Sequence, residues 1–121
     1  MVLGIGCDII EIGRIKKAIE KENFLKRYFT DGEILLIEKK GAETAAGNFS
    51  AKEAVVKAFG TGFSEIMPKD IEILRDDLGK PYVNLHGKAK EHFEIINGGK
   101  IFLSISHTKE YAVAYVVLES A

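Results

Sequence analysis

The chain of 121 residues contains one cysteine, two prolines and no tryptophan. Because Cys7 is alone, no internal disulfide can form, and we expect a reducing, cytoplasmic setting. The apolar start of the chain is interrupted by Gly4, Gly6 and Asp8, too early for a signal peptide or a membrane span. The sequence also lacks Cys/His clusters at zinc spacing, a Walker-type phosphate loop and a nucleophile elbow.

An excess of charge of one sign is also absent. The formal net charge of −1 gives no overall attraction to nucleic acid or to a membrane, so electrostatic recognition must come from a local patch. The apolar fraction of 46% is ordinary for a globular protein, and the length fits a single domain over residues 1–121 with one core.

The most informative stretch is 49–63, a helical pattern that runs into Gly60-Thr61-Gly62. Apolar and small side chains cover most of its circumference and leave a narrow arc for Glu53 and Lys57. Because these two residues are four apart, an acid and a base project from one face, one turn apart. The same spacing is ordinary helix support, and Ser50 with Glu53 matches a capping box, so spacing alone leaves both interpretations open.

A second polar position lies in the first expected strand, 2–12. Gly4, Gly6 and Asp8 share one face of this strand, and the apolar residues share the other. The glycines clear space beside a carboxylate that needs a partner or a cation in such a strand. Alternatively, they only permit close packing, and Asp8 caps a turn.

The third polar position closes a later strand. Alternation over Ser104-Ile105-Ser106 places both serines on one face and leads to His107 at the strand end. A histidine in a turn is also commonly a solvated side chain, so this position carries two interpretations as well.

A basic ridge follows the first strand. Helical periodicity begins near Gly13, and Arg14, Lys17 and Lys21 recur at steps of three and four on one side. The ridge is either a solvated helix face, since Glu20 lies nearby, or a surface for an acidic partner.

The remaining pattern predicts an α+β fold, with a mainly antiparallel sheet wrapped against a long central helix. The expected helices are 13–21, 24–29, 34–40 after a Thr30/Glu33 capping box, 43–59, and 86–97 stopped by Gly98-Gly99; the later strands are 71–75 and 81–85 as a hairpin, 100–106 and 111–118. The strand 111–118 is apolar along almost its whole length and is hard to cover on both faces in so small a chain.

Three segments occur together and in order, namely Gly4-Ile5-Gly6-Cys7-Asp8-Ile9-Ile10-Glu11, Phe49-Ser50-Ala51-Lys52-Glu53-Ala54-Val55-Val56-Lys57-Ala58 and Ser104-Ile105-Ser106-His107-Thr108. Together they resemble the phosphopantetheinyl transferase superfamily over essentially the whole chain. The length and Gly60-Thr61-Gly62 are similar to its short branch, the holo-[acyl-carrier-protein] synthases of fatty-acid synthesis.

The resemblance implies the 4′-phosphopantetheinyl transferase fold and a magnesium-dependent enzyme. Such an enzyme transfers the 4′-phosphopantetheine arm of coenzyme A to a serine of apo acyl carrier protein and releases adenosine 3′,5′-bisphosphate. The roles implied are metal binding by Asp8 and Glu53, catalysis by Glu53 and Lys57, coenzyme binding by Lys52, Gly60, Thr61, Ser106 and His107, and carrier binding by Arg14, Lys17 and Lys21. The resemblance also implies a homotrimer with sites between subunits.

One position departs from the resemblance. Members of this branch often carry arginine just before the Phe-x-x-Lys-Glu run, where this chain has Asn48. A basic contact to the 3′-phosphate of the coenzyme is then missing, and Lys40 or Lys52 is a possible substitute. Two alternatives to the synthase are a non-catalytic module that binds coenzyme A or a carrier protein, and another diphosphate-cleaving magnesium enzyme.

Overall fold

The computed structural model describes residues 1–121. Its strands are β1 (Val2–Glu11), β2 (Ile71–Arg75), β3 (Pro81–Leu85), β4 (Gly98–His107) and β5 (Tyr111–Ser120). Its helices are α1 (Ile12–Ala18), α2 (Glu22–Tyr28), α3 (Asp31–Lys40), α4 (Ala42–Phe59) and α5 (Gly87–Ile95), with a 3₁₀ turn, η1 (Pro68–Asp70).

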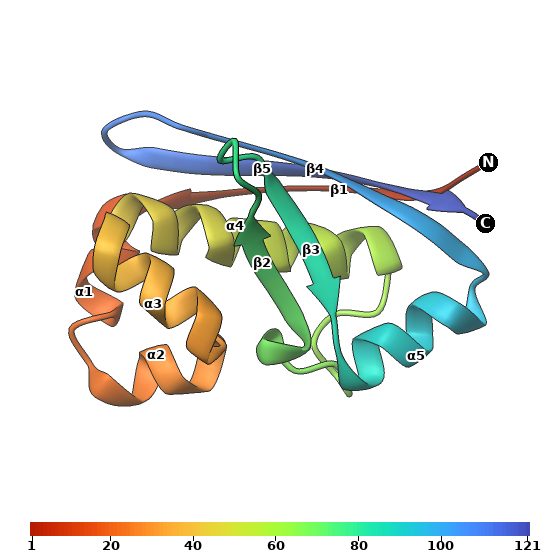
Figure 1. Ribbon diagram of the computed structural model, residues 1–121, viewed down its shortest axis with the longest axis horizontal. Coiled ribbons are helices and arrows are strands. Elements are labelled where there is room, and N and C mark those ends of the chain that lie inside the picture. Colours follow the sequence, from red (N-terminus) through yellow and green to blue (C-terminus); the bar gives the residue numbers. More distant parts are fainter.

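Two antiparallel sheets pack around α4 (Figure 1). In the larger sheet β5 lies between β1 and β4, and the smaller sheet is the predicted β2–β3 hairpin. Helices α1 to α3 gather near the start of α4, and α5 lies near its end (Figure 1). The predicted α+β fold, with an antiparallel sheet against a long central helix, is confirmed. None of the helices combines the length and apolar character needed to cross a membrane.

Helix α4 approaches β1 very closely. Gly4 and Gly6 face the helix, and a Cβ atom at either position would overlap the carbonyl oxygen of Ala58 or Ala54. Any side chain larger than hydrogen would push the helix off the strand. The glycines therefore serve close packing, and Asp8, two residues further along the same face, is held beside the helix rather than in a turn.

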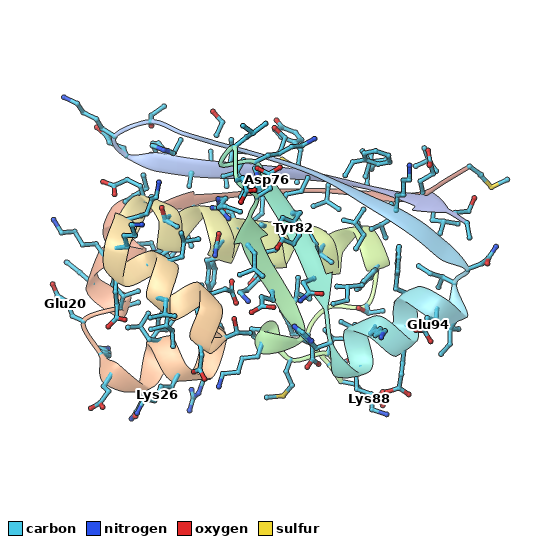
Figure 2. All side chains as sticks on the ribbon, viewed as in Figure 1. Glu20, Lys26, Asp76, Tyr82, Lys88 and Glu94 are labelled. Carbon is cyan, nitrogen blue, oxygen red and sulfur yellow. The ribbon has the colours of Figure 1, made fainter.

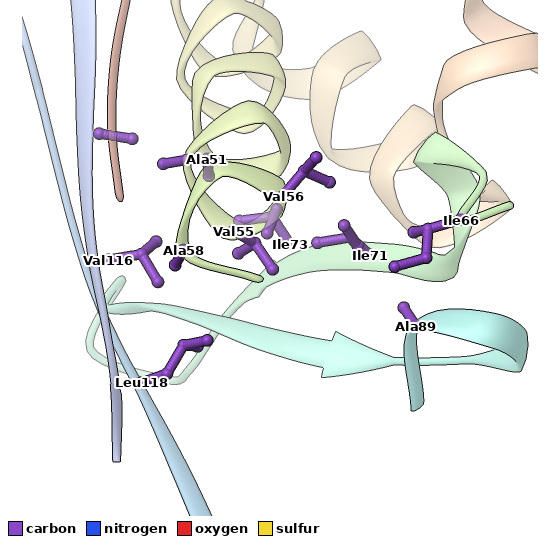
Figure 3. Packing of buried hydrophobic residues seen from close by; sticks show 12 residues of the cluster. Ala51, Val55, Val56, Ala58, Ile66, Ile71, Ile73, Ala89, Val116 and Leu118 are labelled. Atoms are coloured by element: carbon purple, nitrogen blue, oxygen red, sulfur yellow. The ribbon is translucent and has the colours of Figure 1, made fainter. Parts of the chain in front are cut away.

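The main core lies between this sheet, α4 and β2. Val116 and Leu118 of β5 face Val55 and Ala58 of α4 (Figure 3). On the other side of the helix, the core continues to β2 through Ile71 and Ile73, which are fully buried (Figure 3). Helix α4 is thus covered on most of its circumference, as the sequence predicts. Charged side chains such as Glu20, Lys26, Lys88 and Glu94 extend from the outside of the molecule (Figure 2).

The helix ends confirm some of the predicted signals and correct others. Thr30 and Glu33 form the predicted capping box of α3, and Gly60 ends α4 in the left-handed conformation at φ 76°. The Ser50/Glu53 capping box is wrong, because Ser50 lies inside α4. Helix α5 ends at Ile95 rather than at 97, since Asn97 takes φ 60°; the two glycines after it already belong to β4.

A buried ion pair fixes α4 to the elements on its other side. The Nζ of Lys52 lies 2.7 Å from Oε1 of Glu33, with side-chain exposures of 1% and 0%. The same ammonium donates to the carbonyls of Pro68 at 2.9 Å and Ile71 at 2.6 Å. It also lies 5.4 Å from the ring centroid of Phe29. One side chain therefore connects α4, α3, η1 and β2.

Glu33 is held by further contacts. Asn48 donates its Nδ2 to Oε2 of Glu33 at 3.1 Å and to the carbonyl of Ile73 at 3.0 Å. Burial raises the pKa of Glu33 and lowers that of Lys52, and the opposite charge of each partner counteracts the effect. Because both charges are desolvated, each one stabilises the fold only while the other is present.

We predict that Lys52→Ala lowers the free energy of unfolding by about 3–5 kcal/mol, because it leaves the Glu33 carboxylate buried without its cation. The matched control is Lys26→Ala, which removes an exposed pair with Glu22 (3.7 Å, exposures 73% and 85%) and should cost about 0.5 kcal/mol or less. Denaturant unfolding at one fixed protein concentration measures both. If both variants lose the same free energy of unfolding, the buried pair stabilises the fold no more than the exposed pair does.

Candidate functional site

Two of the three predicted polar positions meet at the β1 side of α4. The Nζ of Lys57 lies 3.1 Å from Oδ1 of Asp8 and donates to the carbonyl of Cys7, also at 3.1 Å. The Asp8 side chain is 15% exposed and that of Lys57 is 54% exposed, so the pair lies at the edge of the protein surface. Glu53, one turn before Lys57, is half-buried beside them.

The charges of this cluster act on one another. Burial raises the pKa of the Glu53 carboxyl above its ordinary value, the negative charge of Asp8 raises it further, and Lys57 lowers it. The two carboxylates are therefore close enough to repel each other. The one positive charge of Lys57 does not balance the two negative charges of Asp8 and Glu53. The cluster therefore attracts a further cation.

The donor set fits magnesium. The chain contains no cluster of three or more His, Cys, Asp or Glu side chains that could enclose a metal ion. Magnesium is typically held by one or two carboxylates and completes its octahedral shell with water and substrate phosphates. Two carboxylates at a solvent-accessible edge match that pattern and do not match a closed protein cage.

Ser50 is a site residue that sequence reasoning missed. Its hydroxyl donates to Oδ2 of Asp8 at 3.1 Å and lies 3.5 Å from the carbonyl of Ala112. Both oxygens of Asp8 are thus engaged, one by Ser50 and one by Lys57. In the sequence, Ser50 could have been recognised as a lone hydroxyl on an alanine-rich helix face, one turn before Glu53. The same position also fitted the capping-box interpretation, which is wrong.

Gly60 and Thr61 follow directly after α4, the helix that carries Glu53 and Lys57. Gly60 follows Lys57 by one turn and donates its N–H to the carbonyls of Val56 and Lys57. Thr61 is partly buried, and its hydroxyl donates to the carbonyl of Gly62 at 3.0 Å. It lines a small hollow together with residues of α5, among them Lys88 and His92.

The third predicted position lies on the other edge of the sheet. Ile105 pairs with Ala114, and Ala114 pairs with Asp8, so Asp8 and His107 stand on opposite edge strands with β5 between them. Alternation along β4 turns His107 toward the α4 side and Ser106 toward the opposite face. The structure therefore does not bring Asp8, Ser106 and His107 together within one chain.

His107 lines a cleft of about 730 Å³. The cleft is bounded by α3, α4, β4 and the β2–β3 turn, and its lining includes Lys40, Arg75, Asp76 and His107. Arg75 was not among the predicted site residues. Its signal was a cation at the end of a strand, directly before a turn rich in aspartate.

Lys40 and Lys52, the two candidates for a basic contact to the coenzyme 3′-phosphate, lie in different places. Lys40 lines the cleft. Lys52, expected to bind the coenzyme, is instead buried, and all three of its N–H donors are taken by Glu33 and two carbonyls. Because no donor remains, this geometry argues against a coenzyme contact by Lys52. Asn48 is also fully buried, and its Oδ1 has no hydrogen-bond partner.

The basic ridge is exposed. Arg14, Lys17 and Lys21 lie at the surface, while Ile12 and Ile15 bury the other side of α1. Beside the ridge is a hollow of about 510 Å³, lined by Lys21, Glu22, Asn23, Phe24, Arg27 and Tyr28. Two cations and two aromatic rings therefore extend the ridge onto α2.

The outer face of the larger sheet is bare and apolar. Each strand contributes to it, with exposures of 72% for Ile5, 64% for Ile9, 58% for Tyr115 and 47% for Phe102. The inner face of β5 is buried under α4, so only one side of this apolar strand is covered within the chain. A continuous apolar face of this kind typically marks an interface.

Comparison with known proteins gives one consistent result. The 4′-phosphopantetheinyl transferase superfamily matches residues 4–116. The holo-[acyl-carrier-protein] synthase of Clostridium tetani is 52% identical over 122 residues, covering 98% of this chain and 97% of the relative.

Solved structures agree with the sequence relatives. The synthase of Bacillus anthracis, in complex with CoA (3′,5′-ADP), matches with a TM-score of 0.83 and 43% identity over 100% of this chain and 99% of that one. The synthase of Helicobacter pylori, in complex with coenzyme A, matches with a TM-score of 0.85 and 36% identity over 95% of this chain and 99% of that one.

Proposed function

Because this chain belongs to the 4′-phosphopantetheinyl transferase superfamily and to its holo-[acyl-carrier-protein] synthases, we propose how its own residues perform the transfer. The reaction moves the phosphopantetheine arm of coenzyme A to an acyl carrier protein. The observation that carries the proposal is the convergence of Asp8, Glu53 and Lys57 at one edge of the fold. The carrier of fatty-acid synthesis is the proposed partner, in a cytoplasmic setting that suits the exposed free thiol of Cys7.

The coenzyme diphosphate lies beside Asp8, Glu53 and Lys57 in this proposal. Asp8 and Glu53 would hold magnesium, which would supply positive charge to neutralise and orient the diphosphate. The carrier serine oxygen forms a bond to the phosphorus that bears the pantetheine arm. The bond from that phosphorus to the oxygen of the adenosine 5′-phosphate breaks, and adenosine 3′,5′-bisphosphate leaves.

The protein side chains divide the remaining work. One oxygen of Asp8 is bonded to Ser50 and the other to Lys57, so Asp8 is the more rigidly held of the two carboxylates. Glu53 has no comparable hydrogen bonds and an upward-shifted pKa, so it or a neighbouring water accepts the serine proton. Lys57, which is half exposed, stabilises the charge that develops on the leaving phosphate oxygen. Gly60 and Thr61, at the end of α4, are proposed to contact the coenzyme.

The first test of the proposal measures the carrier directly. Apo carrier is incubated with this protein, coenzyme A and magnesium, and mass spectrometry detects the gain of one phosphopantetheine arm. Asp8→Asn should lower turnover by roughly a hundredfold, because a neutral amide is a poorer ligand for a hard cation. Raising the magnesium concentration should recover part of the loss.

The control is Glu94→Gln, which neutralises an exposed acid on α5 (Figure 2), a helix that contributes no residue to the cluster. Both variants should keep the circular dichroism spectrum of the parent. Near-normal turnover of Asp8→Asn at limiting magnesium would refute the metal assignment. Binding of coenzyme and carrier without any mass gain would favour the non-catalytic module instead.

A homotrimer with sites between subunits is part of the proposal. One support is the bare apolar face formed by β1, β4 and β5. The other is the division of the site, since Asp8 and His107 lie on opposite edge strands with α4 packed over the sheet between them. A neighbouring copy can bring its His107 edge to the Asp8 edge of the first, which completes the site for one coenzyme. Ser106, which faces outward, then lies near the subunit contact.

We predict a mass of three times the 13.4 kDa chain in sedimentation. Ile5→Lys, at a position 72% exposed in the single chain, should dissociate the assembly and abolish transfer without unfolding the chain. Ile95→Lys, at a position 81% exposed on α5, is the matched control and should leave the assembly intact. A fully active monomer would end the idea of shared sites.

Docking of the carrier on Arg14, Lys17 and Lys21 is the last part of the proposal. The net charge of −1 does not attract an acidic protein, so a local ridge must do so. The aromatic hollow beside Lys21 offers apolar area next to these charges. Rim charges act mainly on the association rate and are screened over about 8–10 Å at physiological salt.

We predict that Arg14→Glu raises the carrier KM roughly tenfold at low salt and flattens its salt dependence. The coenzyme KM should stay unchanged, because no residue of α1 lines the cleft at His107. Lys88→Glu makes the same charge change on α5 and should leave both constants as they are. If the carrier KM of Arg14→Glu equals that of the parent at low salt, the ridge is only a solvated helix face.

A further inference from the structure

Glu72 is a buried carboxylate that the proposed transfer does not use. It lies on β2, and its side chain is 11% exposed. A carboxylate removed from water needs hydrogen-bond donors. The Oε2 of Glu72 accepts from the hydroxyl of Thr30 at 2.5 Å, and its Oε1 accepts from Nδ2 of Asn84 and Nε2 of His86, each at 3.0 Å. Three donors that are distant in sequence from Glu72 therefore converge on one carboxylate.

These donors keep the carboxylate ionised. Burial alone raises the pKa of Glu72, but the hydrogen bonds from Thr30, His86 and Asn84 outweigh burial and bring the pKa below its ordinary value. Because an ionised carboxylate only accepts hydrogen bonds, Nε2 of His86 is the donor in its contact. Hydrogen bonds to an ionised acceptor are stronger than those between neutral groups. The contacts of Glu72 are therefore able to hold the elements that supply the donors.

The Glu72 junction, formed by Glu72, Thr30, Asn84 and His86, joins α3 to both strands of the β2–β3 hairpin and to the start of α5. Thr30 is the N-cap residue of α3. Asn84 pairs with Glu72 across the hairpin, and His86 stands directly before α5. The first turn of α3 comes so close that a Cβ atom at Gly32 would lie 3.2 Å from Oε2 of Glu72. At this point α3 and the hairpin are held against each other.

The same interface has a second set of contacts on the side of α4. Glu33, in the first turn of α3, is bonded to Lys52 and Asn48 of α4, and these two residues also donate to backbone carbonyls of β2. A single contact would allow α3 and β2 to rotate about it, whereas two separate contacts fix the angle between them. The Glu33 contacts hold one side of the interface, so the Glu72 junction sets the angle from the other side.

The two elements that meet at the junction also form two walls of the cleft at His107. Helix α3 contributes Leu36 and Lys40, and the hairpin contributes residues 76–79 of its turn, whereas no residue of the Glu72 junction lines the cleft. The strand runs four residues from Glu72 to the turn, about 13 Å at roughly 3.3 Å per residue. A small rotation at the junction therefore displaces the turn by a larger distance and changes the width of the cleft.

We propose that Glu72 is a positioning residue that fixes the angle between α3 and the β2–β3 hairpin, and thereby the affinity of the cleft for the nucleotide end of coenzyme A. This inference rests on the proposed function, in which the coenzyme extends from the Asp8 edge of one chain to the His107 edge of its neighbour. Glu72 touches neither the coenzyme nor the reacting atoms and acts only through the two walls. Its loss changes the coenzyme KM and leaves the chemical step as it is.

The decisive measurement separates the coenzyme KM from kcat. Glu72→Gln removes the charge at nearly constant size, and Thr30→Val removes the hydroxyl that reaches Glu72 from α3. Both should raise the coenzyme KM about threefold to thirtyfold, the range for residues that influence a ligand without touching it. The carrier KM and kcat should stay within about twofold of the parent. Thr30→Ser keeps the hydroxyl and should keep the coenzyme KM of the parent.

The control is a destabilised variant outside the junction. Ile66→Val removes one methyl group at a position that is 5% exposed and does not line the cleft, so it should lower the unfolding temperature and leave both KM values unchanged. All assays run well below the unfolding temperature of each variant. If Glu72→Gln does not fold, Asn84→Ala removes one donor from the same carboxylate and carries the same expectation. An unchanged coenzyme KM in the folded junction variants, or an equal rise in Ile66→Val, would overturn the proposal.

A binding measurement makes the inference independent of catalysis. Isothermal titration calorimetry with adenosine 3′,5′-bisphosphate should give a Kd about threefold to thirtyfold higher for Glu72→Gln than for the parent. Equal affinity of the two proteins would refute the positioning role of Glu72, whatever their activity. A protein that modifies no carrier but shows this difference would refute the proposed function and leave the positioning role standing.

Discussion

The contact between the backbone of α4 and the glycine face of β1 determines where every group of the proposed catalytic edge lies. Gly4 and Gly6 admit the carbonyls of Ala58 and Ala54, so the helix lies on the strand without intervening side chains. At that separation, Asp8 reaches both Ser50 and Lys57 across the interface. A methyl group at either glycine would move the helix outward and separate the residues on which the site depends.

The same packing explains which parts of the structure could be predicted from the sequence. Period-2 alternation separates Gly4, Gly6 and Asp8 from their apolar neighbours, and helical spacing places Glu53 and Lys57 one turn apart. These local rules predicted the fold class, α4 and the capping box of α3. They could not decide which face of β1 meets the helix, since an apolar face normally points inward. Here Ile5 and Ile9 point outward, and the homotrimer proposed above is our explanation for their exposure.

Ser50 and Arg75, which were not predicted as site residues, and Lys52, which was expected to bind the coenzyme, have one cause in common. Ser50 bonds to Asp8, 42 residues away in sequence, and Lys52 bonds to Glu33, 19 residues away. Arg75 lines a cleft formed by elements that are distant in sequence. No periodicity within one helix or strand encodes such pairs. Lys52 is the clearest case: the family resemblance implied a coenzyme contact, whereas in the structure all of its hydrogen bonds go to protein groups.

The buried position of Lys52 bears on the residue that follows it. Successive helical residues point about 100° apart, so a side chain fixed on one flank of α4 sets the direction of the next. Lys52 is fixed by Glu33 and two carbonyls on the β2 side, which leaves Glu53 directed toward Asp8 on the β1 side. The orientation of α4 about its own axis is thus fixed from both flanks, by a buried ion pair on one side and by glycine packing on the other. Because both constraints act on backbone positions, the half-exposed carboxylate of Glu53 keeps its direction without hydrogen bonds of its own, and its oxygens stay available for a cation or a proton.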